Sequence, residues 1–247
     1  MCYIENMNPQ KSSRSRHFPY QHPTFGRGKN VKDESAWKKT IYYVWWSYLK
    51  RNEEYLKTCE SKGKGSLSKL YEDFGDVRAD DFKAWWTEDG RGAKLFSNPP
   101  AEETVRLLSK NEEAPIEGDH LLVSVPLNLP KKFILQRFRS LLDQHHKGQR
   151  GKRYAKTSKA KYQFTGQPNI EALTTALNVW DKRIEHPKMK LWELGQFLPL
   201  NKHLYVDYLK SGKPLDTASK KLMEATVSRY IKKARLSISM TSKGMFP

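Results

Sequence analysis

The feature that most constrains the fold is an aromatic stretch at residues 41–49, with the sequence IYYVWWSYL. It lies in a longer run in which apolar residues recur every three or four positions, the spacing that places them on one face of a helix. Asp33 precedes this run and is a suitable N-cap, so we expect a helix from Asp33 to about Cys59. Its buried face should consist of Trp37, Ile41, Val44, Trp45, Tyr48 and Leu49.

Two more helices are expected before residue 97. Ser66 should begin a short helix that ends at Gly75, because glycine is typical of helix C-termini. Residues 76–90 should form the next helix. The sequence contains Trp-Trp pairs at 45–46 and 85–86, which suggest a repeat or a stacking platform. Both pairs lie on helical apolar stripes, however, and this position favours packing in a core.

Four helices, one strand and a short helix or strand around Thr104–Leu108 are expected in the remainder of the chain. Residues 120–129, HLLVSVPLNL, are short, apolar and bounded by Gly and Pro, which predicts a strand. Pro130 should open an amphipathic helix, and Asn169 should cap another. Two helices should follow, at 190–198 and 215–239. The fold class is therefore mainly α-helical with one or two short strands, arranged in two helical units.

Specific side chains of these helices are expected in the core because of their helical spacing. In the helix after Asn169 they are Ile170, Leu173, Leu177, Trp180 and Ile184. In the final helix they are Leu222, Val227, Tyr230, Ile231, Ala234 and Ile238.

The chain divides into four expected parts. Residues 1–32 should form a flexible basic arm, because they show no apolar period and contain Pro9, Pro19 and Pro23. Residues 33–110 should form an aromatic-rich helical domain, 111–164 a strand, a helix and a basic loop, and 165–247 a basic C-terminal helical domain. The arm mixes cations with Phe18, Tyr20 and Phe25. This mixture suits an arm that orders on nucleic acid, and equally an untethered tail.

Positive charge is concentrated in the C-terminal part of the chain. The formal net charge is +18, and residues 144–247 hold 21 Lys and Arg against 7 Asp and Glu, a net +14. A surplus segregated in this way indicates a face that meets a polyanion, of which nucleic acid is the commonest inside a cell. No carboxylate lies between Asp143 and Glu171. A solvated loop is the ordinary interpretation of such a run, and phosphate binding is the functional one.

Three groups of cations are the candidate nucleic-acid-binding residues, since Lys and Arg hold phosphates and a helix fits the major groove. The helix after Pro130 contributes Lys131, Lys132, Arg137 and Arg139. The basic loop contributes Lys147, Arg150, Lys152, Arg153, Lys156, Lys159 and Lys161. The final helix contributes Lys220, Lys221, Arg229, Lys232, Lys233 and, on the same face, Arg235.

The helix order near the C-terminus is that of a helix-turn-helix protein. The fit is imperfect, because 16 residues separate Leu198 from Leu215, far more than the usual short turn. A divergent helix-turn-helix and a helical bundle that only resembles one both remain open.

The sequence contains no motif that assigns catalysis or a cofactor. Gly-rich phosphate loops and zinc-binding histidine pairs are missing, and Cys2 and Cys59 are too few for a cysteine zinc cluster. The acidic residues Glu72, Asp73, Asp76, Asp80 and Asp81 are expected to be caps and turn residues. No apolar run is long enough for a membrane span and the N-terminus lacks a signal core, so we expect no membrane contact and a cytoplasmic protein.

Several stretches carry a resemblance to a group of known proteins. YYVWWSYLKRNEEYLKTC, LYEDFGDV and FKAWW resemble the N-terminal part of small bacterial transcriptional-regulator-like proteins of prophages and integrative elements. VSRYIKKARLSISMTSKGMFP is similar to their C-termini. The resemblance implies a role linked to DNA and identifies no catalytic residues.

Composition, charge and resemblance together predict a protein that binds nucleic acid, most directly double-stranded DNA, for regulation or assembly on a bacterial mobile element, without catalysis. Two alternatives stay open: an RNA-binding accessory module of a ribonucleoprotein, and a nuclease or recombinase with an unrecognised site. The expected partners are DNA, with RNA as the other polyanion, and a protein at the aromatic N-terminal domain.

Overall fold

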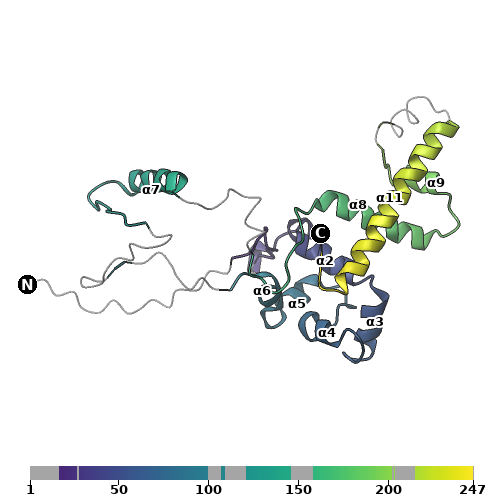
Figure 1. The fold of residues 1–247 in the computed structure, drawn as a ribbon, viewed down its shortest axis with the longest axis horizontal. Coiled ribbons are helices and arrows are strands. Elements are labelled where there is room, and N and C mark those ends of the chain that lie inside the picture. The colour runs from purple at the N-terminus through teal and green to yellow at the C-terminus, as the bar shows by residue number, and fades with distance from the viewer. Residues whose placement is uncertain are drawn as a thin grey trace, which may run out of the picture. The chain divides into compact units, whose positions relative to one another are not determined.

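The computed structural model describes residues 17–26, 28–99, 107–108, 121–145, 158–201, 203 and 215–246. Helices account for 59% of these residues, which confirms the mainly α-helical class (Figure 1). The chain forms two compact units: residues 1–99 together with 155–247, and residues 100–154. Residues 33–99 and 165–247, which the sequence assigned to two separate helical domains, therefore fall in one unit, and residues 100–110 fall in the other.

The prediction of one continuous helix from Asp33 to about Cys59 is wrong. The structure has three helices there: α1 (Ser35–Lys38), α2 (Ile41–Leu49) and α3 (Glu53–Glu60). Thr40 and Asn52 interrupt the run because each has an extended backbone and a side chain that accepts a hydrogen bond from the following turn. Such N-caps end one helix and begin the next.

The next helices lie close to their predicted positions. A 3-10 turn at Gly28–Asn30 precedes all the α-helices. The helix α4 spans Ser68–Phe74 and ends at Gly75, whose φ of 63° is accessible to glycine at low cost. The helix α5 spans Phe82–Thr87. A 3-10 turn, Glu88–Gly90, leads directly into a helix that the sequence pattern did not predict, α6 (Arg91–Phe96).

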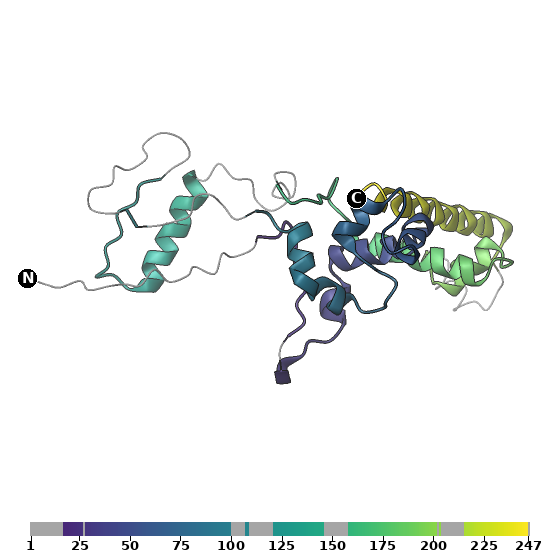
Figure 2. The same ribbon diagram turned by 90° about the horizontal axis from the view of Figure 1, so that it is seen from below.

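The C-terminal helices α8 (Ile170–Glu185), α9 (Leu191–Phe197) and α11 (Thr217–Thr241) confirm the three that the sequence predicts there. Asn169 and Asp216 cap α8 and α11 with their side chains. The long helix α11 packs against α8, α9 and α2, as Figures 1 and 2 show.

An aromatic core joins the early and late parts of the sequence. Trp45 of α2 is fully buried, and its ring lies 5.4 Å from that of Phe246 and 5.2 Å from that of Phe164. The other three tryptophans of the two pairs are also buried: Trp46, Trp85 and Trp86. The prediction that the pairs serve packing is therefore confirmed, and this shared core is the reason that residues 33–99 and 158–246 form one unit.

A second, smaller core fixes α11 in place. It consists of Val179, Leu194, Leu200, Met223 and Val227, drawn from α8, the α9 region and α11. Gly195 permits the close approach of α9, since a Cβ there would lie 2.4 Å from Met223. The face of α11 opposite this core is consequently fixed in orientation.

Two predicted core positions are wrong. Leu222 is 49% exposed and Ile184 is 62% exposed. The buried stripe of α11 instead begins one residue later, at Met223, and Val179 takes the core position on α8. Among the other predicted residues, Leu173, Leu177, Val227, Ala234 and Ile238 are buried, and Ile170, Trp180, Tyr230 and Ile231 are partly buried.

The described part of the N-terminal arm, residues 17–26 and 28–32, corrects the expectation of a free aromatic arm. Phe18, Tyr20 and Phe25 pack against the aromatic core. The Tyr20 hydroxyl donates a hydrogen bond of 2.9 Å to the Gly166 carbonyl. These rings are therefore engaged in packing, because the core offers them apolar area close to the chain. Residues 1–16 and Arg27 lie outside the described residues.

The strand expected at 120–129 is wrong for residues 121–129, which have an irregular backbone. A strand needs a second strand to pair its backbone groups. The described residues contain only an isolated bridge, between Phe164 and Phe246. Directly after residues 121–129, α7 (Lys131–His145) confirms the predicted helix after Pro130. The Pro130 carbonyl accepts the first helical hydrogen bonds.

Candidate nucleic-acid interface

The exposed side of α11 carries five cations, Lys221, Arg229, Lys232, Lys233 and Arg235, which we call the α11 basic face. Helical periodicity places them opposite the buried stripe that includes Met223 and Ala234. From Lys221 to Arg235 the face is about 21 Å long at 1.5 Å per residue.

Little negative charge compensates the α11 basic face. The only carboxylate within α11 is that of Glu224, which is partly buried and lies three residues from Lys221 at the edge of the face, and Asp216 caps the N-terminus. None of the five cations forms an ion pair with a described carboxylate. The small residues Ala225 and Ser228 lie between the cations and are exposed. An anionic backbone can therefore approach this helix closely.

Two cations of α11 touch aromatic rings of neighbouring helices. The Lys220 ammonium lies 4.7 Å from the ring centre of Trp192 in α9, and Lys220 is partly buried. The Arg235 guanidinium lies 6.0 Å from the ring of Trp180 in α8. Cation–π contacts of this kind orient the side chain while its charge remains available. Lys220 thus lies at the edge of the face and Arg235 within it.

Several cations in the aromatic N-terminal half are neutralised by carboxylates. The Lys50 ammonium lies 2.6 Å from Asp80, and the Arg78 guanidinium lies 2.6 Å from Asp76. Arg91 lies 2.7 Å from Glu88 in the same way. The uncompensated charge of this unit, among the residues that the structure describes, is accordingly most concentrated on α11.

The acidic cluster lies where the sequence predicted caps and turns. The Asp81 side chain caps α5, and hydrogen bonds from Arg78 hold the pKa of Asp76 below its usual range. The Lys50 ammonium likewise lowers the pKa of Asp80. Within the described ranges, no group of three or more His, Cys, Asp or Glu side chains is arranged to hold a metal ion.

Asp73 has a role that the sequence did not indicate. It accepts a hydrogen bond of 2.7 Å from the Tyr162 hydroxyl, and the Lys161 ammonium lies 2.5 Å from its other oxygen. Burial raises the pKa of Tyr162, so the phenol keeps its proton and donates a hydrogen bond to the carboxylate. Lys161, one of the predicted phosphate ligands, is therefore already paired with Asp73.

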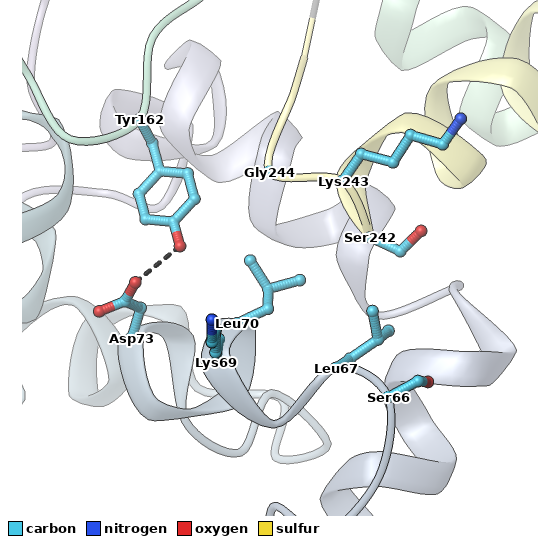
Figure 3. A pocket seen from close by; sticks show the side chains of 9 residues that line it. All are labelled: Ser66, Leu67, Lys69, Leu70, Asp73, Tyr162, Ser242, Lys243 and Gly244. Atoms are coloured by element: carbon cyan, nitrogen blue, oxygen red, sulfur yellow. Dashed lines mark hydrogen bonds between the residues drawn. The ribbon is translucent and has the colours of Figure 1, made fainter.

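Asp73 and Tyr162 also border an open pocket of about 260 Å³ between α4 and the end of α11. Figure 3 shows the two side chains pointing toward one another. Both carboxylate oxygens have donors, so Asp73 is not a free base in this arrangement; it fastens residues 161–162 to α4. The pocket lining consists of Ser66, Leu67, Lys69, Leu70, Asp73, Tyr162, Ser242, Lys243 and Gly244.

Of the remaining cations of the predicted basic loop, the structure describes one, Lys159. Lys159 is exposed, and its backbone N–H donates a hydrogen bond of 2.9 Å to the Asn98 side chain. The other predicted ligands of the loop, Lys147, Arg150, Lys152, Arg153 and Lys156, lie outside the described residues.

The predicted cations of α7 belong to the other unit. Lys131, Lys132, Arg137 and Arg139 are all exposed. The Arg137 guanidinium lies 5.3 Å from the ring centre of Phe133. These four residues belong to the unit of residues 100–154, and the α11 basic face belongs to the other unit.

A helix-turn-helix arrangement is neither established nor contradicted. The helices α8, α9 and α11 contact one another, as in a trihelical unit. Residues 204–214, which connect α9 to α11, lie outside the described residues. The divergent helix-turn-helix and the bundle that only resembles one both remain predictions.

The sequence pattern did not indicate that two leucines of α11 are exposed: it placed Leu222 in the core and gave no position for Leu236. Leu222 is 49% exposed and Leu236 is 62% exposed, and helical spacing puts them beside Arg229. Their position could have been inferred only from the burial of Met223, which sets the rotation of the helix. Apolar side chains at such positions can contact thymine methyl groups.

No model of a known protein family matches this chain, and neither a curated protein nor a solved structure matches it. The resemblance to regulator-like proteins of mobile elements therefore stays a prediction. Within the described part of the chain, every helix falls short of the length or the apolar character that crossing a membrane requires.

Proposed function

We propose that the chain binds nucleic acid, with double-stranded DNA as its preferred form, through the α11 basic face. The observation that carries this proposal is the set of five exposed cations on one helix face, none paired with a described carboxylate. Cations arranged in this way displace the counterions condensed on DNA, which is the main source of sequence-independent affinity.

The packing of α11 supports rigid presentation of these cations. The helix has 25 residues and is held by α2, α8 and α9. A helix held on one side by a core presents its other side to a groove without a large entropic cost, because little of it is ordered on binding. The major groove of B-DNA is wide enough for an α-helix.

The composition of the face favours duplex DNA over single strands. Proteins that bind single strands use exposed aromatic rings on which bases stack. The exposed residues of the α11 basic face are cations, small residues and two leucines, and none of them is aromatic. We propose binding without catalysis; the regulatory or assembly role on a mobile element rests on the resemblance alone.

Binding of the full chain to duplex DNA, single-stranded DNA and structured RNA, measured in parallel by fluorescence anisotropy over a range of salt, tests the proposal. Replacement of Lys221, Arg229, Lys232 and Arg235 by Gln should flatten the log–log salt slope for duplex DNA by about two to four units, at roughly 0.9 per lost phosphate contact. The same titrations with magnesium report cleavage, the signature of the nuclease alternative.

The matched control removes the same charge elsewhere in the unit. Lys57, Lys64, Lys83 and Lys94 are exposed cations of the N-terminal half, and their replacement by Gln should leave the slope nearly unchanged. Equal effects of the two variants would show that only net charge matters and would contradict the interface. Tighter binding to structured RNA than to duplex DNA would favour the RNA-binding alternative.

A further inference from the structure

Residues 121–145 expose an unusual amount of apolar surface. Eight of their large apolar side chains are more than a third exposed, and no residue of the segment is buried. Leu122 is 75% and Leu127 is 88% exposed. Single exposed apolar residues are common, whereas eight within 25 residues are a concentration typical of binding surfaces. The eight are Leu121, Leu122, Val125, Leu127, Leu129, Phe133, Leu135 and Leu142.

The helix α7 within this segment has the pattern of a docking helix. Ile134, Phe138, Leu141 and Leu142 recur at intervals of four, three and one, so they lie on one face. Ile134, Phe138 and Leu141 are only partly buried, and Leu142 is 39% exposed. Residues with this spacing are the anchors by which amphipathic helices enter apolar grooves.

The residues before α7 have the composition of a strand without a partner strand. Residues 121–125, LLVSV, are apolar and partly β-branched, yet their backbone is irregular. Their backbone groups form no hydrogen bond with another described residue. Such a segment can complete its hydrogen bonding by adding to the sheet edge of another protein.

We infer that residues 121–145 are a docking element for a protein partner whose apolar groove is rimmed by carboxylates, with α7 in the groove and residues 121–125 along an exposed strand edge. This inference does not depend on the α11 basic face. It places a protein partner on residues 121–145, rather than on the aromatic N-terminal domain where the sequence predicts one.

The positive charge of residues 121–145 favours an acidic protein partner over a second copy of this chain. Residues 121–145 carry four exposed cations, Lys131, Lys132, Arg137 and Arg139, and the single carboxylate of Asp143. Two copies would bring these like charges together, which is unfavourable at an interface. Carboxylates at the rim of a partner groove would instead pair with them.

The irregular backbone selects a protein over a lipid surface. A basic amphipathic helix alone would suit anionic membranes. Residues 121–125, however, combine apolar side chains with backbone groups that have no partner among the described residues, and such backbone does not enter the hydrocarbon region because each unpaired group costs several kcal/mol. A sheet edge satisfies the side chains and the backbone together.

Photocrosslinking of the full chain in its host cells identifies the occupant. With benzoylphenylalanine in place of Phe138, we expect a discrete covalent adduct with one other protein. The matched control carries the same group in place of Gln136, which is exposed on the other side of α7, and should give little adduct. The Phe138 adduct should persist in the variant that lacks four α11 cations, which separates this inference from DNA binding.

Titration calorimetry with that purified protein then tests the mode of binding. Leu142→Ala and Phe138→Ala should each weaken the affinity about tenfold or more, as expected of groove anchors, and Gln136→Ala should not. Arg137→Glu combined with Arg139→Glu should weaken binding and reduce its salt dependence. Hydrogen exchange of the residue 121–125 amides should slow in the complex.

Four results would overturn the inference. The first is the absence of any protein adduct at residue 138. The second is an adduct only with a second copy, accompanied by a dimer mass in light scattering. The third is cosedimentation with vesicles of phosphatidylcholine and phosphatidylglycerol in place of protein binding. The fourth is a partner whose affinity is unaffected by the Phe138 and Leu142 substitutions.

Discussion

The guanidinium of Arg51, in the turn between α2 and α3, binds the carboxylate of Asp181 in α8 through two hydrogen bonds, Nε to Oδ1 at 2.9 Å and Nη2 to Oδ2 at 2.6 Å. The third nitrogen, Nη1, donates to the Ser47 carbonyl at 2.6 Å. Both charged side chains are 31% exposed. This pair joins the turn after α2 to a helix that is far away in the sequence, and it helps to fix how α8 meets the aromatic core.

A double-mutant cycle on this pair should measure a coupling free energy of unfolding of about 1–2 kcal/mol, because the hydrogen bonds are bidentate, charge-assisted and partly shielded. The variants are Arg51→Ala, Asp181→Ala and the double substitution, compared by urea unfolding. The control cycle on Lys50 and Asp80 should give a coupling of about 0.5 kcal/mol or less, since Asp80 is 91% exposed. Equal coupling in the two cycles would contradict this assignment.

Phe246→Ala should lower the free energy of unfolding by about 3–5 kcal/mol, the usual cost of deleting a fully buried Phe side chain. The Phe246 ring is fully buried against Trp45 and Tyr48. The neighbouring Met245 is 40% exposed, so Met245→Ala is the matched control and should cost far less. Chemical unfolding followed by tryptophan fluorescence compares the two variants, and a similar loss in both would refute the core position.

Asp76 should make a pH-dependent contribution to stability. Hydrogen bonds from Arg78 lower the pKa of Asp76 in the folded state. Its contribution is therefore complete above the unfolded-state value of about 3.9 and is lost as pH falls through the lower folded-state pKa. Asp76→Asn should thus be less stable than the parent at pH 7, and the difference should shrink below about pH 4. Urea midpoints between pH 7 and pH 2 measure it; a difference independent of pH would exclude the ion pair as its cause.

The basic loop is expected to contact phosphates without reading sequence. Replacement of Arg150, Lys152, Arg153 and Lys156 together by Gln should weaken binding to all duplexes alike and flatten the salt slope by about two to four units, with the fold intact. Anisotropy titrations and circular dichroism provide the two readouts. An unchanged slope would return this segment to the interpretation of a solvated loop.

Substitutions on α11 should change the preference between DNA sequences if this helix lies in a groove. Replacement of Lys220, Lys221 and Arg229 by Ala should reorder the duplexes recovered in a selection from random sequence, because side chains that reach base edges carry sequence information. The loop variant is the control and should recover the parent set at lower affinity. Identical preferences in all three proteins would confine α11 to phosphate contacts.

The sequence predicted those parts of the fold that depend on neighbouring residues. Asn169 caps α8, Gly75 ends α4, and α7 begins after Pro130, all as expected from local backbone chemistry. The irregular backbone of residues 121–129, where a strand was predicted, could not be foreseen in the same way. Strand formation depends on a partner strand, and the described residues do not supply one.

Pairings between distant residues could not be predicted from periodicity. A helical pattern identifies an apolar face without identifying what packs on it, so the joining of α2 to α8 and the packing of Tyr20 were invisible in the sequence. The candidate interface shows the same limit. Lys221 and Arg229 were found by their place in a helical pattern, whereas the pairing of Lys161 with Asp73 depends on tertiary structure.

The stacking of Phe246 on Trp45 bears on how the protein is made. During translation, Trp45 leaves the ribosome about 200 residues before Phe246, so the aromatic side of α2 lacks this ring while most of the nascent chain is synthesised. Contacts of such large sequence separation slow folding, and transiently uncovered apolar surface invites aggregation. Production of this protein should therefore be sensitive to the supply of chaperones and to the speed of elongation.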